Sequence, residues 1–404
     1  MPKLIRITTV PLSLDKLLGR QLTFMNNCLD VTAISADEKE LARVAQKYGV
    51  KYFHLEMTRE ITPLQDLKAL WKLYGYLRRE KPQIVHTHTP KAGIVGMLAA
   101  KLAGVPNRLH TVAGMPLMEA SGAKRMVLDL VEKMTYASAT KVYPNSKGLY
   151  DFIVMHQYAP TGKLKVIGNG SSNGIDTAFF SPDVFTERKC DMLRNELLLK
   201  PQVFVFVFVG RLVGDKGINE LVAAFKKLVS DSEKSDSEPE HNEDLPSVKL
   251  LLVGPLETEL DPLQAETLEE IENNSHIIMT GYQNDVRPYF AVSNALVFPS
   301  YREGFPNVVM QAGAMGLPAI VTDINGCNEI VEEGVNGTII PTKDTEALYE
   351  AMKTMLQDEE WRMRLKKNAR PMITARYEQQ VVWEALLEEY RAMVPILKER
   401  RQKI

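Results

Sequence analysis

Short apolar runs alternate with longer amphipathic segments along most of the chain, and this pattern predicts β-strands alternating with α-helices. Helices show apolar residues three or four positions apart, whereas strands buried on both faces read as unbroken apolar runs. Such alternation is typical of a parallel sheet covered by helices. In the first half, strands are expected at residues 3–9, 30–35, 51–57, 82–90, 108–114, 141–146 and 164–170, and helices at residues 20–26, 38–48, 63–79, 91–104 and 124–137.

The same series starts again in the second half, after a linker-like tract rich in turn residues at 173–182. Further strands are expected at residues 203–210, 248–254, 276–281, 295–300, 319–323 and 337–342, with a helix at 218–229. The pattern therefore predicts two Rossmann-like domains, residues 1–172 and 183–370, joined by a hinge at 173–182. Ligands of such sheets bind at the carboxyl ends of the strands, and two such domains imply a cleft between them.

Two segments depart from this rhythm. Residues 230–247 are acidic, serine-rich and almost free of apolar side chains, which predicts a disordered surface insertion; a phosphate-mimicking or binding tail is the alternative. Residues 371–404 are expected to form a long helix to residue 394, followed by a basic end. The apolar stripe of this helix comprises Val381, Val382, Trp383, Leu386, Leu387 and Tyr390, and that of the helix at 63–79 comprises Leu64, Leu67, Leu70, Trp71, Tyr74 and Leu77.

Composition places the 404-residue chain among ordinary globular proteins, with 25% charged and 45% hydrophobic residues. A net charge of -2 gives no overall attraction to nucleic acid. The three cysteines lie far apart without metal-ligand spacing, which favours reduced thiols in a cytoplasm and predicts no metal site. We expect no export signal and no membrane-spanning helix, because the longest apolar tract, residues 92–105, is short and contains Lys101.

The main candidate site is expected within residues 298–323, which read as a strand end, a loop, a short helix and a second strand. Asn307 is the expected N-cap, so the amides from Gly304 onward would be donors at the positive end of a helix dipole. Side chains lean towards the helix N-terminus, so Gln311 and the loop residue Glu303 can face one ligand. A carboxylate repels phosphate, and Glu303 therefore suits a neutral, hydroxyl-rich group. The combination suggests a sugar attached to a phosphate; a solvated Glu303 beside a closely packed helix is the alternative.

A second candidate loop, residues 210–217, follows the very apolar run at 203–209. Arg211 and Lys216 could reach one anion from this loop. Its sequence, GRLVGDKG, matches neither the dinucleotide-binding fingerprint nor the P-loop. Without the first loop, two solvated charges would be the simpler interpretation.

These motifs resemble those of the family 4 (group 1) glycosyltransferases, which are retaining enzymes of GT-B fold that use nucleotide sugars. The resemblance rests on GRLVGDKG, on Glu303 followed by Gly304, Phe305, Pro306 and Asn307, and on the tract at 325–337. Gln311 stands where the family has a second Glu, so its contact with a ribose diol would lack a charge-assisted bond. The family implies a final helix that crosses back to the N-terminal domain.

The resemblance also implies roles for single residues. Arg211 and Lys216 would grip the donor diphosphate and stabilise the leaving group without a metal, so no metal and no cofactor are expected. His110 would face the donor sugar and support catalysis, and Gly19 would lie against the donor phosphate. Gly281 and Tyr282 would hold the base.

The remaining histidines are interpreted from their positions. Alternation puts His86 and His88 on one face of a strand, with His88 nearer the loop. His86 is expected to be a satisfied core residue, and His88 either an acceptor contact or structural. The other four, His54, His156, His241 and His276, show no partner pattern and are expected to be incidental.

The tract around His88 resembles a subgroup that builds bacterial surface glycans. This implies a nucleotide-sugar donor, by resemblance a UDP-sugar, and a saccharide or polyprenyl-diphosphate-linked acceptor, with the protein cytoplasmic and in peripheral contact with the membrane. Basic residues beside apolar helices, namely Lys91, Lys101, Arg108, Lys124, Arg125 and Lys133, are the candidate membrane face, although a plain amphipathic core helix explains the same pattern. The alternatives are a nucleotide-sugar 2-epimerase of the same fold and a non-catalytic two-lobed sugar-binding protein.

Overall fold

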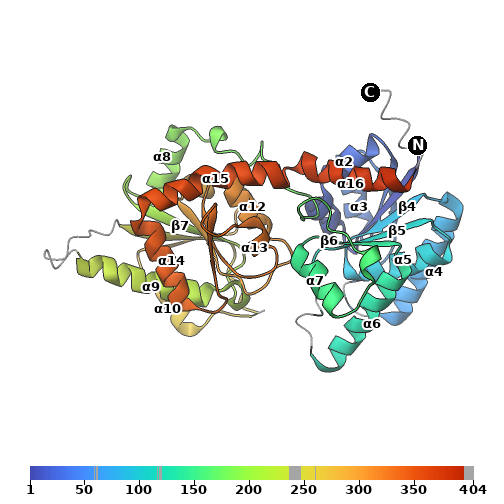
Figure 1. Ribbon diagram of the computed structural model, residues 1–404, viewed down its shortest axis with the longest axis horizontal. Coiled ribbons are helices and arrows are strands. Elements are labelled where there is room, and N and C mark those ends of the chain that lie inside the picture. The colour runs from blue at the N-terminus through green and yellow to red at the C-terminus, as the bar shows by residue number, and fades with distance from the viewer. Residues whose placement is uncertain are drawn as a thin grey trace. The chain divides into compact units, whose positions relative to one another are not determined.

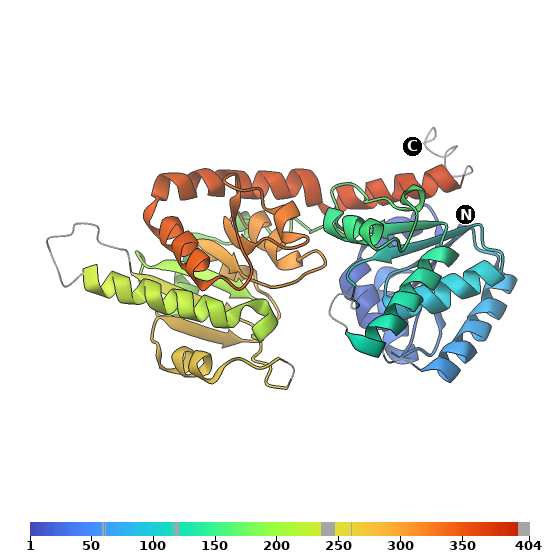
Figure 2. The ribbon, with the colours of Figure 1, turned by 60° about the horizontal axis from the view of Figure 1, so that its bottom comes forward.

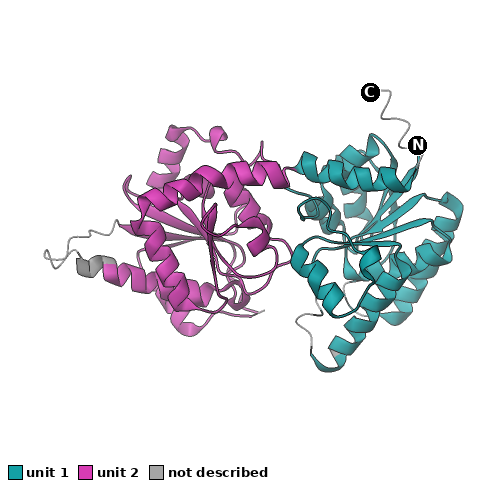
Figure 3. Ribbon diagram, in the orientation of Figure 1, with its two compact units in different colours: residues 1–174, 379–404 teal, residues 175–378 magenta. Residues whose placement is uncertain are grey.

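The computed structural model describes residues 1–58, 60, 62–115, 117, 121–235, 247–259 and 261–394. The chain forms two compact units (Figure 3). Unit 1 comprises Met1–Gly174 together with Gln379–Ile404, and unit 2 comprises Ile175–Glu378. The chain thus returns to unit 1 after unit 2, as the family resemblance implies.

Unit 1 is built on a parallel six-stranded sheet in the order β3-β2-β1-β4-β5-β6. The order reverses direction between β1 and β4, the kind of position where doubly wound sheets bind ligands. Its strands are β1 (Lys3–Ile7), β2 (Asp30–Ser35), β3 (Lys51–His54), β4 (Ile84–Thr87), β5 (Asn107–Val112) and β6 (Lys141–Pro144). Its helical segments are α1 (Pro11–Ser13), a π-helical turn (Leu14–Leu18), α2 (Gln21–Asn26), α3 (Glu38–Tyr48), α4 (Pro63–Glu80), α5 (Pro90–Leu102), α6 (Gly122–Ser138), α7 (Lys147–Met155) and a 3₁₀ turn (Thr161–Lys163).

Alternation along each strand divides the core of unit 1 between the two faces of the sheet. On β1, Ile5 and Ile7 pack with α4, α5 and α6, whereas Leu4 packs with α2, α3 and the C-terminal helix. Helix α5 contacts both α4 and α6, and the three helices lie together over one face (Figures 1 and 2). Which face a strand residue occupies therefore decides which set of helices it meets.

Unit 2 repeats this architecture with the parallel order β12-β11-β10-β7-β8-β9. Its central strand β7 is buried along its whole length. The strands are β7 (Phe204–Val209), β8 (Val248–Val253), β9 (Ile277–Gly281), β10 (Ala295–Phe298), β11 (Ala319–Thr322) and β12 (Gly337–Ile340). The helical segments are α8 (Glu187–Glu196), α9 (Ile218–Ser235), α10 (Ala265–Asn273), α11 (Arg287–Ala291), α12 (Asn307–Ala314), α13 (Cys327–Ile330), α14 (Thr345–Gln357) and α15 (Glu359–Tyr377), with 3₁₀ turns at Pro182–Val184 and Gly214–Lys216. Two parallel α/β sheets in one chain agree with the expected GT-B fold.

The C-terminal helix is divided differently from the prediction. Pro371 does not begin a helix but lies inside α15, which belongs to unit 2. The helix is interrupted at Glu378. The next helix, α16 (Gln379–Met393), packs on unit 1, where Trp383 contacts Phe24 of α2. Residues 371–378 therefore belong to unit 2, and the crossover helix proper starts at Gln379. The predicted basic end at 398–403 lies outside the described residues.

Three further expectations need correction. Helix α9 extends to Ser235, so residues 230–235 are helical rather than part of a disordered insertion; residues 236–246 lie outside the described part of the chain. Residues 164–170 form no strand, and only Leu164 makes an isolated bridge to Val142. The predicted apolar stripe of α4 is only partly buried: Leu77 is buried, while Leu64, Leu67 and Trp71 are exposed. Leu73, which was not part of that stripe, is buried.

Candidate active site

Two loops of unit 2 leave the same edge of the sheet, because β7 and β10 are parallel neighbours. The first loop runs from Gly210 through the 3₁₀ turn to Gly217, and the second joins β10 to α12. Gly217 has φ +70, and a Cβ there would lie 2.2 Å from the Pro299 carbonyl oxygen. Only glycine lets the first loop approach the second this closely.

This approach brings Lys216 and Glu303 together. The Lys216 Nζ atom lies 2.6 Å from Glu303 Oε1 and 3.4 Å from the Ser300 hydroxyl oxygen. The Ser300 hydroxyl lies 3.3 Å from the same carboxylate oxygen. The two charged side chains are 16% and 20% exposed, so the pair is largely shielded but still reachable from solvent. A fixed ammonium beside a carboxylate offers one group for an anion and one for hydroxyls.

Asn325, which follows β11, fixes the backbone of the Glu303 loop by hydrogen bonds. Its Nδ2 atom donates to the carbonyl oxygens of Glu303 (3.0 Å) and Gly304 (2.6 Å). Gly326 then packs so closely that a Cβ would lie 2.8 Å from Pro306 Cδ. The sequence analysis missed Asn325 as a positioning residue; its place in the family-like tract after β11 was the available signal.

The start of α12 differs slightly from the prediction. Pro306 occupies the N-cap position and Asn307 is the first helical residue, and no side chain caps this end. The uncapped first turn leaves its amides for a ligand. Gln311 lies one turn further along the helix and is partly exposed. Phe305 packs against the ring of Tyr377.

The other cations near these loops are paired. The Arg211 Nη1 atom lies 2.5 Å from Glu257 Oε2, and Arg211 is half exposed. Arg302, which the sequence analysis did not single out, lies 2.7 Å from Asp215. The structure therefore brings Lys216, but not Arg211, into contact with Glu303. The role of Arg211 towards a diphosphate stays a prediction.

Gly281 ends β9 with φ +65, and Tyr282 after it is 70% exposed. An exposed ring on a strand-end loop is available to stack on a base, so the predicted role of Gly281 and Tyr282 stays a prediction.

In unit 1, Gly19 ends the π-helical turn with φ +50, and its amide donates to Leu14 O at 2.9 Å. Such turns are frequent at functional sites, but no contact of Gly19 tests the predicted phosphate role.

His110 lies inside β5, two residues before the last residue of the strand. Its Nδ1 atom is 2.7 Å from the Thr87 hydroxyl, and a Cβ on Gly93 of α5 would lie 2.7 Å from its ring. The side chain is 3% exposed, and burial lowers the pKa of His110 to about 4. His110 is thus a neutral imidazole packed under α5, and its catalytic role stays a prediction.

His86 is the satisfied core residue that the sequence predicted. Its Nδ1 lies 2.6 Å from the Tyr390 hydroxyl of α16 and its Nε2 lies 2.7 Å from the Thr111 hydroxyl. His88 lies on the same face, with the two ring centres 4.2 Å apart. His88 Nε2 accepts a hydrogen bond from the Arg6 Nε–H at 3.0 Å.

No group of three or more His, Cys, Asp or Glu side chains that could hold a metal ion occurs among the described residues. Cys327 lies close to the Glu303 site, where burial and the nearby carboxylate raise the pKa of its thiol well above the usual value. A neutral, buried thiol suits packing rather than chemistry.

The comparisons with known proteins agree with this geometry. The family described as "Glycosyl transferases group 1" matches residues 191–372, and the family described as "Glycosyl transferase 4-like domain" matches residues 24–170. The capsular polysaccharide biosynthesis glycosyltransferase CapM of Staphylococcus aureus is 33% identical over 393 residues, which cover 97% of each chain.

Two further proteins extend the likeness. The UDP-Gal:alpha-D-GlcNAc-diphosphoundecaprenol alpha-1,3-galactosyltransferase of Escherichia coli is 29% identical, covering 82% of this chain and 81% of the relative. The solved structure of Anabaena Alr3699/HepE in complex with UDP and glucose superposes with a TM-score of 0.76, covering 97% of this chain and all of the other at 17% identity. Matching sequence over nearly the whole length and matching fold together show that this chain belongs to the group 1 glycosyltransferases of GT-B fold.

Proposed function

We propose that this glycosyltransferase moves a sugar from a UDP-sugar to a lipid-linked saccharide in bacterial surface polysaccharide synthesis, with retention of configuration and without a metal ion. The observation that carries the proposal is the Lys216–Glu303 pair at the start of α12. It supplies a cation for a diphosphate and a carboxylate for sugar hydroxyls within 3 Å of each other. A sugar nucleotide carries both chemical groups.

The departing nucleoside diphosphate gains negative charge in the transition state, and a cation fixed beforehand stabilises that charge. Lys216 is held by Glu303 and Ser300, so little reorganisation is needed when the diphosphate arrives. Glu303 accepts hydrogen bonds from hydroxyls of the transferred sugar, and the uncapped amides of α12 add donors. Gln311 contributes a neutral contact to the nucleotide ribose.

The proposed substrates follow from the relatives. The E. coli relative is named for UDP-Gal as donor and for a GlcNAc-diphosphoundecaprenol acceptor, and the S. aureus relative for capsular polysaccharide biosynthesis. These names favour transfer to an acceptor over 2-epimerisation of the donor or non-catalytic sugar binding. No second carboxylate was singled out as a nucleophile. We therefore propose that the acceptor hydroxyl attacks the anomeric carbon of the donor sugar from the same face that the diphosphate leaves.

The test is UDP release by the purified protein from UDP-galactose, UDP-glucose, UDP-N-acetylglucosamine and UDP-N-acetylgalactosamine. Each donor is offered with and without a short polyprenyl-diphosphate-linked N-acetylglucosamine, and with and without EDTA. We expect release that depends on this acceptor, survives EDTA and yields a product whose anomeric configuration by NMR matches the donor. Conversion of UDP-N-acetylglucosamine to its 2-epimer without acceptor would favour an epimerase, and loss of UDP release with EDTA would refute metal independence. Donor binding with neither UDP release nor epimerisation would favour a sugar-binding protein.

We also propose that unit 1 rests on the membrane through α4 and α6. Helices α4 and α6 both pack on α5 (Figure 2), and each presents apolar side chains to solvent. The exposed apolar residues are Leu64, Leu67 and Trp71 on α4, with Met126, Leu130 and Met134 on α6. Exposed Lys68, Lys72 and Lys133 lie on the same helices, a composition suited to anionic lipid.

Three of the basic residues expected on this face have other partners, and one of them is Arg125, which lies 3.2 Å from Asp129 and donates to the Leu117 carbonyl oxygen. Lys91 is 10% exposed and pairs with Asp66, and Arg108 donates to the carbonyl oxygens of Ser138 and Val105. No helix in the described part of the chain is long and apolar enough to cross a membrane. Peripheral contact is therefore the form of association to test.

Flotation with phosphatidylglycerol vesicles tests the membrane proposal. We expect the wild type to float and the double variant Leu67→Asp/Leu130→Asp to lose most of its binding, because two charges would enter the lipid interface. Met363→Asp, on an exposed apolar position of α15 in unit 2, is the matched control and should float like wild type. Equal flotation of both variants would refute the proposal.

A further inference from the structure

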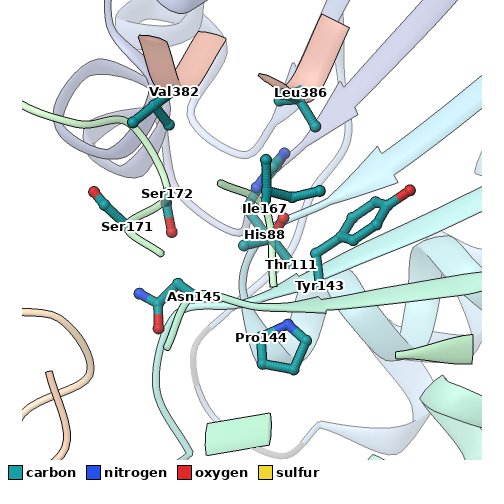
Figure 4. A pocket seen from close by; sticks show the side chains of 10 residues that line it. All are labelled: His88, Thr111, Tyr143, Pro144, Asn145, Ile167, Ser171, Ser172, Val382 and Leu386. Atoms are coloured by element: carbon teal, nitrogen blue, oxygen red, sulfur yellow. The ribbon is translucent and has the colours of Figure 1, made fainter. Parts of the chain in front are cut away.

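A small cavity of unit 1 lies at the carboxyl ends of β4, β5 and β6, beneath α16 (Figure 4). Its volume is about 20 Å³, on a measure by which a single water needs roughly 10–15 Å³. It therefore has room for one hydroxyl-sized group at its base and opens towards solvent. The lining residues are His88, Thr111, Tyr143, Pro144, Asn145, Ile167, Ser171, Ser172, Val382 and Leu386.

Three polar atoms on the wall of this cavity are buried and have no hydrogen-bond partner among the described residues. They are His88 Nδ1, Asn145 Oδ1 and the Ser172 hydroxyl oxygen. His88 is 4% exposed and Asn145 is 6% exposed. Buried polar atoms of native proteins are nearly always paired, so three of them around one cavity indicate an absent polar partner.

The tautomer of His88 follows from Arg6. A guanidinium can only donate, so the Arg6 Nε–H bond at 3.0 Å makes His88 Nε2 the acceptor. Burial and the neighbouring His86 and Arg6 lower the pKa of His88 well below its usual value, so the ring is neutral. The ring proton must therefore reside on Nδ1, the ring nitrogen that has no partner among the described residues.

Arg6 itself is fully buried and is held by neutral groups. Its other nitrogens donate to the Tyr390 hydroxyl at 3.0 Å and to Gln21 Oε1 at 2.6 Å. No ion pair involves Arg6 within the described residues. Its unscreened charge polarises the His88 ring and makes the Nδ1–H a stronger donor. Arg6 thus acts as a positioning residue behind His88.

The loop that carries Ser172 is fixed against the same edge of the sheet. The Ser171 amide donates to Asn145 O at 2.7 Å, and Gln21 Nε2 donates to Ser172 O at 3.1 Å. Asn145 and Ser172 are therefore held in place independently of any ligand. The cavity is built before a ligand arrives, which lowers the entropic cost of binding.

We propose that this cavity is a subsite for a non-reacting hydroxyl of the saccharide acceptor, which accepts a hydrogen bond from His88 Nδ1–H and donates one to Asn145 Oδ1. The proposal rests on the function proposed above and names the group that the N-terminal unit recognises. A hydroxyl both donates and accepts, so its chemistry matches an unpaired donor and an unpaired acceptor that line one cavity. An anionic oxygen would satisfy His88 but would meet the lone pairs of Asn145 Oδ1.

Two substitutions of His88 separate recognition from structure. In His88→Gln the amide group can still accept from Arg6 at the place of Nε2, but nothing replaces the Nδ1–H donor. In His88→Asn the Nδ2 donor replaces Nδ1–H, but the acceptor for Arg6 is lost. His156→Gln, at an exposed position after α7, is the control.

Steady-state kinetics use polyprenyl-diphosphate-linked N-acetylglucosamine as acceptor probe. We expect His88→Gln to raise the acceptor KM about tenfold with donor KM and kcat unchanged, and His88→Asn to stay within about threefold of wild type. The opposite order would mean that His88 only supports Arg6, and an unchanged KM in both would mean that the cavity holds water. Either result overturns the proposal.

Asn145→Asp tests the nature of the group. A carboxylate still accepts from a hydroxyl, so we expect acceptor KM within a few-fold of wild type, whereas Asn145→Leu should raise it about tenfold. A large loss in Asn145→Asp that high salt relieves would show that an anionic oxygen occupies the cavity, and would refute the hydroxyl.

Histidine-selective ¹⁵N NMR reads the cavity without turnover. Adding methyl N-acetylglucosaminide should shift the Nδ1 resonance of His88 in the wild type but not in Asn145→Leu. Acceptor-dependent UDP release without this shift would overturn the subsite and leave the proposed function intact. A shift in a protein that never releases UDP would overturn the proposed function and leave the subsite intact.

Discussion

Replacing Lys216 with Ala removes the cation that pairs with Glu303, and two effects should follow. Loss of a preorganised contact to developing charge costs about 10²–10³ in rate, or about 2.7–4 kcal/mol. The free protein also loses the partner of a carboxylate that is only 20% exposed, and an unpaired, partly buried group costs about 1–3 kcal/mol. Glu303 keeps the Ser300 hydroxyl at 3.3 Å, which favours the lower part of that range.

The two effects are separable by experiment. Initial rates of UDP release at saturating donor and acceptor should fall by at least 10², while thermal unfolding of unit 2 should shift down by about 2–4 °C for each kcal/mol lost. Glu303→Gln added to Lys216→Ala should restore much of the stability, since no charge is then unpaired, but none of the rate. Lys227→Ala, an exposed lysine of α9 paired with Glu346, is the matched control. A Lys216→Ala enzyme that keeps a fifth of wild-type turnover would refute the role assigned to this residue.

Three further predictions concern the stability of the two units. Gly217→Ala should destabilise unit 2 by clearly more than Gly334→Ala in urea unfolding: both glycines have φ +70, but only at Gly217 does a Cβ meet a backbone oxygen, and equal losses would contradict the packing argument. Tyr390→Phe should cost unit 1 about 1–3 kcal/mol, because Arg6 and His86 both lose a buried partner, whereas Tyr282→Phe at an exposed position should be neutral in the same measurement. The free energy of unfolding should fall as the pH drops from 7.5 to 5.5. Burial lowers the pKa values of His86, His88 and His110 in the folded state. The unfolded chain therefore binds protons at these residues first, below the ordinary histidine pKa of about 6.5. Each such histidine removes up to about 1.4 kcal/mol per pH unit, and a denaturant midpoint independent of pH over this range would show that the three are not neutral in the folded protein.

Periodicity was a good guide wherever a segment buries one consistent face. The limits of β2 and α3 agree with the predicted residues 30–35 and 38–48, and Gly49 follows α3 in a left-handed conformation. Periodicity failed where apolar side chains are exposed to solvent rather than buried in the core. Leu64, Leu67 and Trp71 of α4 look like core residues in the sequence but are exposed, because apolar side chains mark a contact surface without saying what covers it.

The candidate site shows the same division. Glu303 and Lys216 could be proposed as one site because each follows a predicted strand, and parallel strands end at a common edge. Their direct contact depends on strand order, since β7 and β10 are neighbours in the sheet although α9, β8, α10, β9 and α11 lie between them in the chain. For His110 the sequence motif predicted contact with a ligand. In the structure its ring is instead buried between β5 and α5.

The order of apolar and polar residues was sufficient for two α/β units and for the loops that carry Lys216 and Glu303, because each of these depends on local periodicity and turn chemistry. The break at Glu378, the partners of Arg6 and the unpaired atoms of His88, Asn145 and Ser172 depended on which distant segments pack together. Arg6 and Tyr390 lie at opposite ends of the chain, and their hydrogen bond forms because α16 returns to the sheet that begins with β1. Contacts between residues so far apart are set by the free energy of the whole fold, and no short stretch of sequence encodes them.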